Sequence, residues 1–149
     1  MLDLKKQYIF SEEVPRLIDM MGKKYLVLYF YPKDLTSGCT RQAIDLKENY
    51  DAILAHDALV VGVSRDPYKK HAKFISTHEL PFDLIADTES ELCRLFDVLK
   101  MKSMYGRTYE GVERSTFLLD NTGEIVHEWR NVKVPNHLED LMQVLSEKK

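Results

Sequence analysis

Apolar and polar positions along the chain follow two patterns, one typical of buried strands and one typical of amphipathic helices. The longest apolar run, Tyr25 to Tyr31, consists of β-favouring side chains and lies between Gly22 and Pro32. A continuous run of this length suits a strand that is buried on both faces. We therefore predict that it forms a central strand of a sheet.

Helical spacing of apolar residues follows this first strand. It predicts a helix that begins at or close to Cys39. A second strand is expected over residues 58–63. After it, Asp66 can cap a helix whose first position is Pro67, because proline lacks the N–H group that would be unpaired there. Strands and helices thus alternate in the first half of the chain.

The alternation continues through the middle of the chain. Residues 84–86 form a short apolar run, and Asp87 or Thr88 can cap the helix that follows. Three apolar residues of that helix are expected to face inward: Leu92, Leu95 and Phe96.

The C-terminal part is expected to differ, with a hairpin before the last helix. Residues 115–119 and 124–130 are β-favouring runs, and residues 120–123 between them are turn formers. Asn136 can cap the final helix. At the opposite end of the chain, Ser11 followed by two glutamates indicates a helix start.

The predicted order is therefore βαβαβα, a hairpin and a helix. Parallel crossovers come from the alternating part and antiparallel pairing from the hairpin. This order is typical of an α/β protein with a thioredoxin-like fold, in which helices cover both faces of a mixed central sheet. A chain of 149 residues is the size of one ordinary domain, so we predict a single domain over residues 1–149.

Charge and hydropathy exclude several classes of protein. The net charge is −3, and no basic cluster exceeds pairs such as Lys69-Lys70, which argues against nucleic-acid binding. The first residues lack the apolar stretch of a secretion signal. The longest apolar run is shorter than the ~20 residues that a membrane-spanning helix needs. We expect a soluble protein of the cytoplasm with no membrane partner.

Cys39 is the strongest candidate for chemistry. A lone cysteine is more often a small buried apolar residue than a nucleophile. Here, however, it follows a buried strand and starts a helix, where free backbone N–H groups favour a thiolate. The neighbouring residues are polar or small, so we expect Cys39 on a loop surface. Thr36 can direct its hydroxyl to the same point, and Pro32 stiffens the exit from the strand.

The sequence gives little support for a metal or a cofactor. Its five histidines lack metal-ligand spacing, and no glycine-rich phosphate loop is present. We interpret His71, on a helix, and His127, on a strand, as structural or surface residues.

The stretch around Cys39 resembles the active-site loop P-x-x-x-T-x-x-C of peroxiredoxins, with Pro32, Thr36 and Cys39 at its fixed positions. Four further segments resemble the branch called bacterioferritin-comigratory protein or peroxiredoxin Q. They are Tyr29-Phe-Tyr-Pro-Lys-Asp34, Gly62-Val-Ser-Arg-Asp66, Met104-Tyr-Gly106 and Glu113-Arg-Ser-Thr-Phe117.

This resemblance implies a thiol-dependent peroxidase, an antioxidant oxidoreductase. The thiolate of Cys39 would attack hydrogen peroxide or an organic hydroperoxide and become a sulfenic acid. Arg114 matches the arginine that the family carries beside the thiolate, where it would stabilise developing negative charge. Without the resemblance, a surface ion pair of Arg114 with Glu113 would be the simpler interpretation.

The chain departs from the family pattern at the second cysteine. Ile44 and Ile75 occupy the positions where relatives place a resolving cysteine, and Gln42 stands where a glutamate is common. Cys93 remains, and its apolar neighbours favour a buried core thiol. We therefore expect recycling by an external thiol, either thioredoxin or a glutaredoxin-glutathione system, and a monomer as the default.

A second function class stays open. The same fold could serve as a non-enzymatic redox sensor or a chaperone-like binding protein. The joint presence of Pro32, Thr36, Cys39 and Arg114 argues against it, because a pure binding protein has no chemical need for all four.

Overall fold

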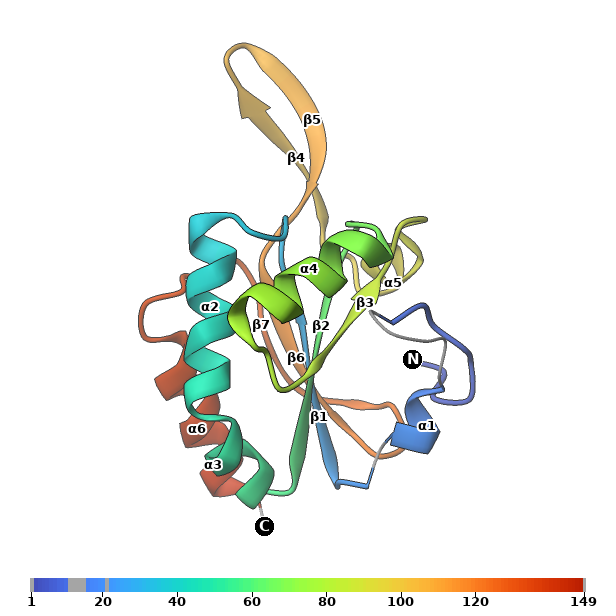
Figure 1. The fold of residues 1–149 in the computed structure, drawn as a ribbon, viewed down its shortest axis with the longest axis vertical. Coiled ribbons are helices and arrows are strands. Elements are labelled where there is room, and N and C mark those ends of the chain that lie inside the picture. Colours follow the sequence, from blue (N-terminus) through green and yellow to red (C-terminus); the bar gives the residue numbers. More distant parts are fainter. Residues whose placement is uncertain (1, 11–15, 21, 149) are drawn as a thin grey trace.

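A computed structural model describes residues 2–10, 16–20 and 22–148. The helix start predicted at Ser11 lies outside the described residues. The described strands of the main sheet are ordered β3-β2-β1-β6-β7 (Figure 1). Their bounds are Tyr25–Phe30 for β1, Ala58–Ser64 for β2, Asp83–Ala86 for β3, Ser115–Asp120 for β6 and Ile125–Trp129 for β7.

Strand pairing in this sheet is mixed. β1 pairs in parallel with β2, and β2 in parallel with β3. β1 pairs antiparallel with β6, and β6 antiparallel with β7. The sequence therefore predicted both the parallel crossovers and the final hairpin correctly.

Six helices are described, and they lie on both faces of the sheet (Figure 1). Their bounds are Leu17–Met20 for α1, Ser37–Glu48 for α2, Tyr50–Ala55 for α3, Tyr68–His78 for α4, Glu91–Leu95 for α5 and His137–Glu147 for α6. In this part of the chain no helix is both long and apolar enough to cross a bilayer.

The side chains of β1 divide the core into two clusters. Val27 and Tyr29 belong to the first cluster, with residues from α2, α3, α4 and α6. Leu26 and Leu28 belong to the second, with residues from α1, α5 and the N-terminal segment. Because successive side chains of a strand point to opposite faces, these clusters lie on opposite sides of the sheet. The predicted α/β class with helices on both faces is confirmed.

Three details differ from the sequence-based expectation. The helix after β1 is divided at Asn49 into α2 and α3. Pro67 is the N-cap of α4 rather than its first helical residue. Leu95 is 52% exposed, although it was expected to face inward. The buried face of α5 centres on Leu92 and Cys93, about 100° around the helix axis from Leu95.

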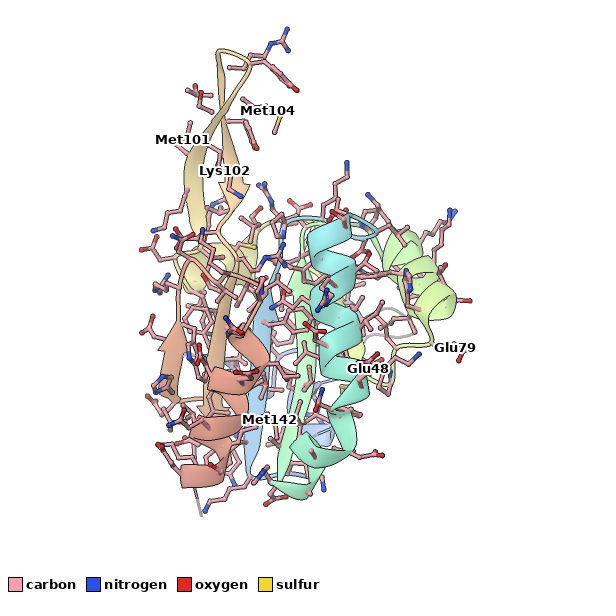
Figure 2. The ribbon with its side chains drawn as sticks, turned by 90° about the vertical axis from the view of Figure 1, so that its left-hand side faces the viewer. Glu48, Glu79, Met101, Lys102, Met104 and Met142 are labelled. Atoms are coloured by element: carbon pink, nitrogen blue, oxygen red, sulfur yellow. The ribbon has the colours of Figure 1, made fainter. Side chains whose placement is uncertain are left out.

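A second sheet, absent from the predicted order of elements, projects from the body (Figure 1). It consists of β4 (Leu99–Met104) and β5 (Arg107–Val112). Its two-residue turn, Tyr105 and Gly106, has positive φ at both positions, as a type I′ hairpin requires. Figure 2 shows side chains of this hairpin, Met101 and Met104 among them, clear of the rest of the protein.

Close packing at Gly62 of β2 gives a stability prediction. A Cβ atom added there would lie 2.7 Å from Leu84 Cδ2 and 2.8 Å from Tyr29 Cζ. The rigid tyrosine ring cannot give way cheaply, so Gly62→Ala should lower the free energy of unfolding by about 1–3 kcal/mol. Urea denaturation followed by circular dichroism measures this. Gly22→Ala is the matched control, because nothing lies within 4 Å of its added Cβ; equal midpoints for both variants would contradict the prediction.

Candidate active site

Cys39 lies in the first turn of α2, directly beyond the carboxyl end of β1. Thr36 is the N-cap of this helix, with an extended backbone (φ −84°, ψ 156°). The N–H of Thr40 donates the first helical hydrogen bond to Thr36 O, at 2.8 Å. The N–H groups of the preceding turn have no partner within the helix and present partial positive charge. The sequence predicted this helix start correctly.

Cys39 is nevertheless buried, with 2% of its surface exposed. The expectation that it lies on a loop surface is therefore wrong. It shares the inner face of α2 with Ala43 and Leu46, four and seven residues later, and this face packs on the cluster that contains Tyr29. The helical repeat, rather than the polarity of the adjacent loop, determines where its side chain lies.

Arg114 lies immediately before β6 and directs its guanidinium at the thiol. Its Nη2 donates to Cys39 Sγ at 3.3 Å, and its Nη1 donates to Gln42 Oε1 at 2.6 Å. Among the ion pairs of the described residues, none joins Arg114 to Glu113. The two contacts hold the planar guanidinium of Arg114 between the sulfur of Cys39 and the side-chain amide of Gln42, both of which belong to α2.

Two positive features converge on the sulfur: the start of α2 and the guanidinium of Arg114. Gln42 is buried and contacts Arg114 as a neutral acceptor, so this contact does not cancel the arginine charge. A thiolate at Cys39 would be stabilised by both features. The arrangement suits a nucleophilic sulfur.

Two buried polar atoms near this site have no partner among the described residues: Tyr29 Oη and Gln42 Nε2. The guanidinium can only donate, so Gln42 must turn its oxygen to Arg114 and leave its nitrogen unpaired. Burial, with contributions from Asp34 and Cys39, raises the pKa of Tyr29 well above its usual value, so its hydroxyl keeps its proton. Unpaired buried donors are uncommon, and at a reactive site they can serve an incoming oxygen.

Thr36 and Pro32 occupy the exposed loop above the buried cysteine. Thr36 Oγ1 donates to Lys33 O at 2.8 Å, so the hydroxyl proton is used within the loop. Its oxygen can still accept a hydrogen bond from a substrate. The structure therefore brings Cys39 and Arg114 into contact, whereas Thr36 and Pro32 are exposed residues of the loop that precedes Cys39.

The second cysteine lies in a different part of the core. Cys93 is fully buried in α5 and belongs to the cluster on the opposite face of the sheet from Cys39. Burial, followed by a hydrogen bond to Asp87, raises the pKa of the Cys93 thiol far above its usual value. This environment fits the predicted role of a core thiol and opposes a nucleophilic one.

One group of the described residues could offer ligands to a metal: Asp34, Asp66 and His71, whose ligand atoms lie within 4.8 Å of one another. These atoms are already engaged. His71 Nδ1 lies 2.5 Å from Asp34 Oδ2, and Asp66 Oδ2 accepts from the backbone N–H of Asp34 at 2.8 Å. The geometry is that of a hydrogen-bonded network. His71, predicted as a structural or surface residue, is buried, and its pairing with Asp34, 37 residues earlier, was not predicted.

The comparison with known proteins agrees with the site geometry. Residues 4–128 match the AhpC/TSA family. Peroxiredoxin Bcp of Bacillus subtilis (strain 168) is 47% identical over 91% of this chain and 85% of its own length. Peroxiredoxin Bcp of Escherichia coli (strain K12) is 38% identical over 91% of this chain and 86% of its own.

Solved structures give the same result for the fold. Peroxiredoxin Q of Xanthomonas campestris superposes with a TM-score of 0.89 at 38% identity, covering 97% of this chain and 92% of its own. The bacterioferritin comigratory protein of the same species, studied for its alkyl peroxide reduction activity, gives 0.88 at 37% identity, with the same coverage of each chain. The fold is thus thioredoxin-like, as predicted. The chain belongs to the AhpC/TSA family and, within it, to the peroxiredoxin Q or bacterioferritin-comigratory branch of the peroxiredoxins.

Proposed function

We propose that this thiol peroxidase reduces hydrogen peroxide and organic hydroperoxides with Cys39 as its peroxidatic cysteine. The observation that carries the proposal is the 3.3 Å contact between Arg114 Nη2 and Cys39 Sγ at the start of α2. It provides a fixed cation beside a cysteine in the first turn of a helix, whereas Cys93, in the first turn of α5, lies in the opposite core cluster and beside Asp87. The whole chain, residues 1–149, would act as a single domain, and its location in the cytoplasm stays a prediction from the sequence.

The reaction assigns a role to each site residue. The Cys39 thiolate attacks the terminal oxygen of the peroxide, the O–O bond breaks, and the sulfur becomes a sulfenic acid. The other oxygen leaves as an alkoxide or hydroxide and takes up a proton. Arg114 stabilises the negative charge that moves from sulfur to the departing oxygen. Thr36 accepts a hydrogen bond from the peroxide, and Pro32 keeps the loop over the sulfur.

An external thiol completes the cycle in this proposal. It attacks the sulfenic sulfur, releases water and forms a mixed disulfide, which a second thiol reduces. Two observations support this step: isoleucines stand at positions 44 and 75, and Cys93 lies on the far side of the sheet. Thioredoxin or a glutaredoxin-glutathione system is the proposed reductant, and the protein is proposed to act as a monomer.

Mass spectrometry after one equivalent of hydrogen peroxide tests both halves of the proposal. We expect one added oxygen, trapped as a sulfenic acid on Cys39, and no disulfide between Cys39 and Cys93. Cys93→Ser should keep close to the wild-type rate of peroxide consumption when a small thiol is supplied, because the sealed thiol takes no part. A Cys39–Cys93 disulfide would overturn the one-cysteine cycle. Oxidation of Cys39 no faster than that of free cysteine would favour the redox sensor.

A further inference from the structure

The loop that carries Pro32 and Thr36 is held from below by a sealed network of three side chains. Tyr31 Oη donates to Asp34 Oδ1 at 2.5 Å, and His71 Nδ1 lies 2.5 Å from Asp34 Oδ2. Asp34 is 2% exposed, and Tyr31 and His71 are 0% exposed. Buried charged and polar groups at such short distances form a strong, well-ordered contact.

The proton positions follow from the acceptors. His71 Nε2 lies 3.0 Å from the carbonyl oxygen of Ile85, which can only accept, so this nitrogen carries a hydrogen. The tyrosine hydroxyl donates to one oxygen of Asp34. A second proton is therefore shared between His71 Nδ1 and the other oxygen of Asp34. The three side chains, with Ile85, satisfy one another without solvent.

This network ties the loop to three separate elements. Tyr31 directly follows β1, His71 belongs to α4, and Ile85 belongs to β3. A further bond runs from the backbone N–H of Asp34 to Asp66 Oδ2, at 2.8 Å. Asp66 also contacts Ser64 Oγ at 2.6 Å and Lys70 Nζ at 3.3 Å, so this second anchor is itself held in place.

The backbone beside the network is strained. Leu35, between Asp34 and Thr36, has φ +63°, in the left-handed region that a leucine rarely adopts. The next residue is the N-cap of α2, and Cys39 follows three residues later. If Asp34 lost its anchors, Leu35 could relax to an ordinary conformation and the first turn of α2 could move with it.

Movement of this turn is required by the proposed cycle. Cys39 is too deeply buried for a reducing thiol, which is bulkier than a hydroperoxide, to reach its sulfur, while a small peroxide needs only a narrow approach. We propose that Tyr31, Asp34 and His71 form a latch of positioning residues. The latch holds loop and cysteine closed for reaction with peroxide, and its release opens Cys39 to the reducing thiol. This inference rests on the proposed function.

A latch and a merely structural contact predict different kinetics. Weakening a latch should slow sulfenic acid formation and speed its reduction, because the open conformation becomes more populated. Loss of a structural contact should slow both half-reactions together. The ratio of the two rates therefore separates the alternatives.

The test uses Tyr31→Phe and His71→Gln, each in full-length protein carrying Cys93→Ser. Stopped-flow measurement gives the rate of Cys39 oxidation by hydrogen peroxide. A single turnover of the oxidised protein with dithiothreitol gives the rate of reduction. One thiol of dithiothreitol attacks the sulfenic sulfur, forms a mixed disulfide and releases water. Its second thiol then breaks the mixed disulfide and releases reduced Cys39. We expect the first rate to fall and the second to rise, each by several-fold. The matched control is His127→Gln on β7, whose exposed ring lies outside the network.

Each outcome is decisive. Equal changes in both rates, a change in only one of them, or no change in either, would overturn the latch. Tyr31→Phe removes a single hydroxyl and keeps the ring, so it carries the test if His71→Gln does not fold. The same stopped-flow measurement is first made on the parent protein, which carries only Cys93→Ser. If Cys39 of this parent were not oxidised by hydrogen peroxide, the proposed function would be contradicted rather than the latch.

Discussion

Cys39→Ser should abolish peroxide reduction. A serine hydroxyl stays protonated beside Arg114 and cannot replace the thiolate as nucleophile, whatever the positive charge around it. We expect the rate of peroxide consumption, measured with a thiol donor in excess, to fall by roughly 10³-fold or more, the scale on which enzymes lose activity with their nucleophile. Serine differs from cysteine by one atom, so the buried site beside Ala43 should keep its packing.

Cys93→Ser is the control for this variant, because it makes the same atomic change in the other core cluster. The two variants should have similar urea midpoints and opposite activities. If Cys39→Ser kept full activity, or if only Cys93→Ser lost activity, the assignment of Cys39 as the nucleophile would be contradicted.

Arg114→Met should have the second largest effect. It removes the cation 3.3 Å from Cys39 Sγ while keeping an unbranched side chain of similar length. The loss of charge stabilisation should lower the second-order rate constant for hydrogen peroxide by about 10²–10³-fold, as when one donor to a developing oxyanion is removed. Stopped-flow measurement of Cys39 oxidation gives this constant directly.

Two further variants sharpen this prediction. Arg114→Lys keeps the charge but cannot contact both Cys39 and Gln42 with one planar fork, so its rate should fall between those of the wild type and Arg114→Met. Arg107→Met is the matched control, since Arg107 is exposed on the projecting hairpin. A rate constant of Arg114→Met close to that of Arg107→Met would show that the guanidinium contact has no catalytic role.

Local patterns in the sequence predicted most of the main sheet. All but the last residue of the Tyr25–Tyr31 run form β1, because a strand covered on both faces needs no polar side. The alternation of strands and helices then leaves few arrangements, because connections are short and parallel crossovers share one handedness. The hairpin of β4 and β5 was not predicted because most of its side chains are exposed, so its sequence lacks the regular alternation of apolar and polar residues.

The candidate site was less accessible to local patterns. The short spacing of Pro32, Thr36 and Cys39 places them in one loop and one helix turn. Arg114, by contrast, lies 75 residues from Cys39, so only the resemblance to a family could place it there. The polarity of the loop suggested an exposed cysteine, although the apolar stripe that continues to Leu46 carried the signal of burial.

The network beneath the loop shows the same limit. Asp34 and His71 are separated by 37 residues, and their residue types alone would place both on the surface. Their pairing depends on α4 lying near the carboxyl ends of the parallel strands β1 and β3. Tertiary structure alone creates a sealed acid-base pair from two residues whose local sequence is polar.

The sheet that separates the two cysteines also affects how readily Cys39 is irreversibly oxidised when peroxide is abundant. In the proposed cycle, the sulfenic acid on Cys39 has no internal thiol to resolve it, because Cys93 lies in the core cluster on the other face of the sheet. A second peroxide molecule therefore competes with the reductant for the same sulfur, and its product, a sulfinic acid, is not restored by ordinary thiols. The balance of oxidant and thiol in the surroundings then determines how many turnovers each molecule completes before permanent inactivation.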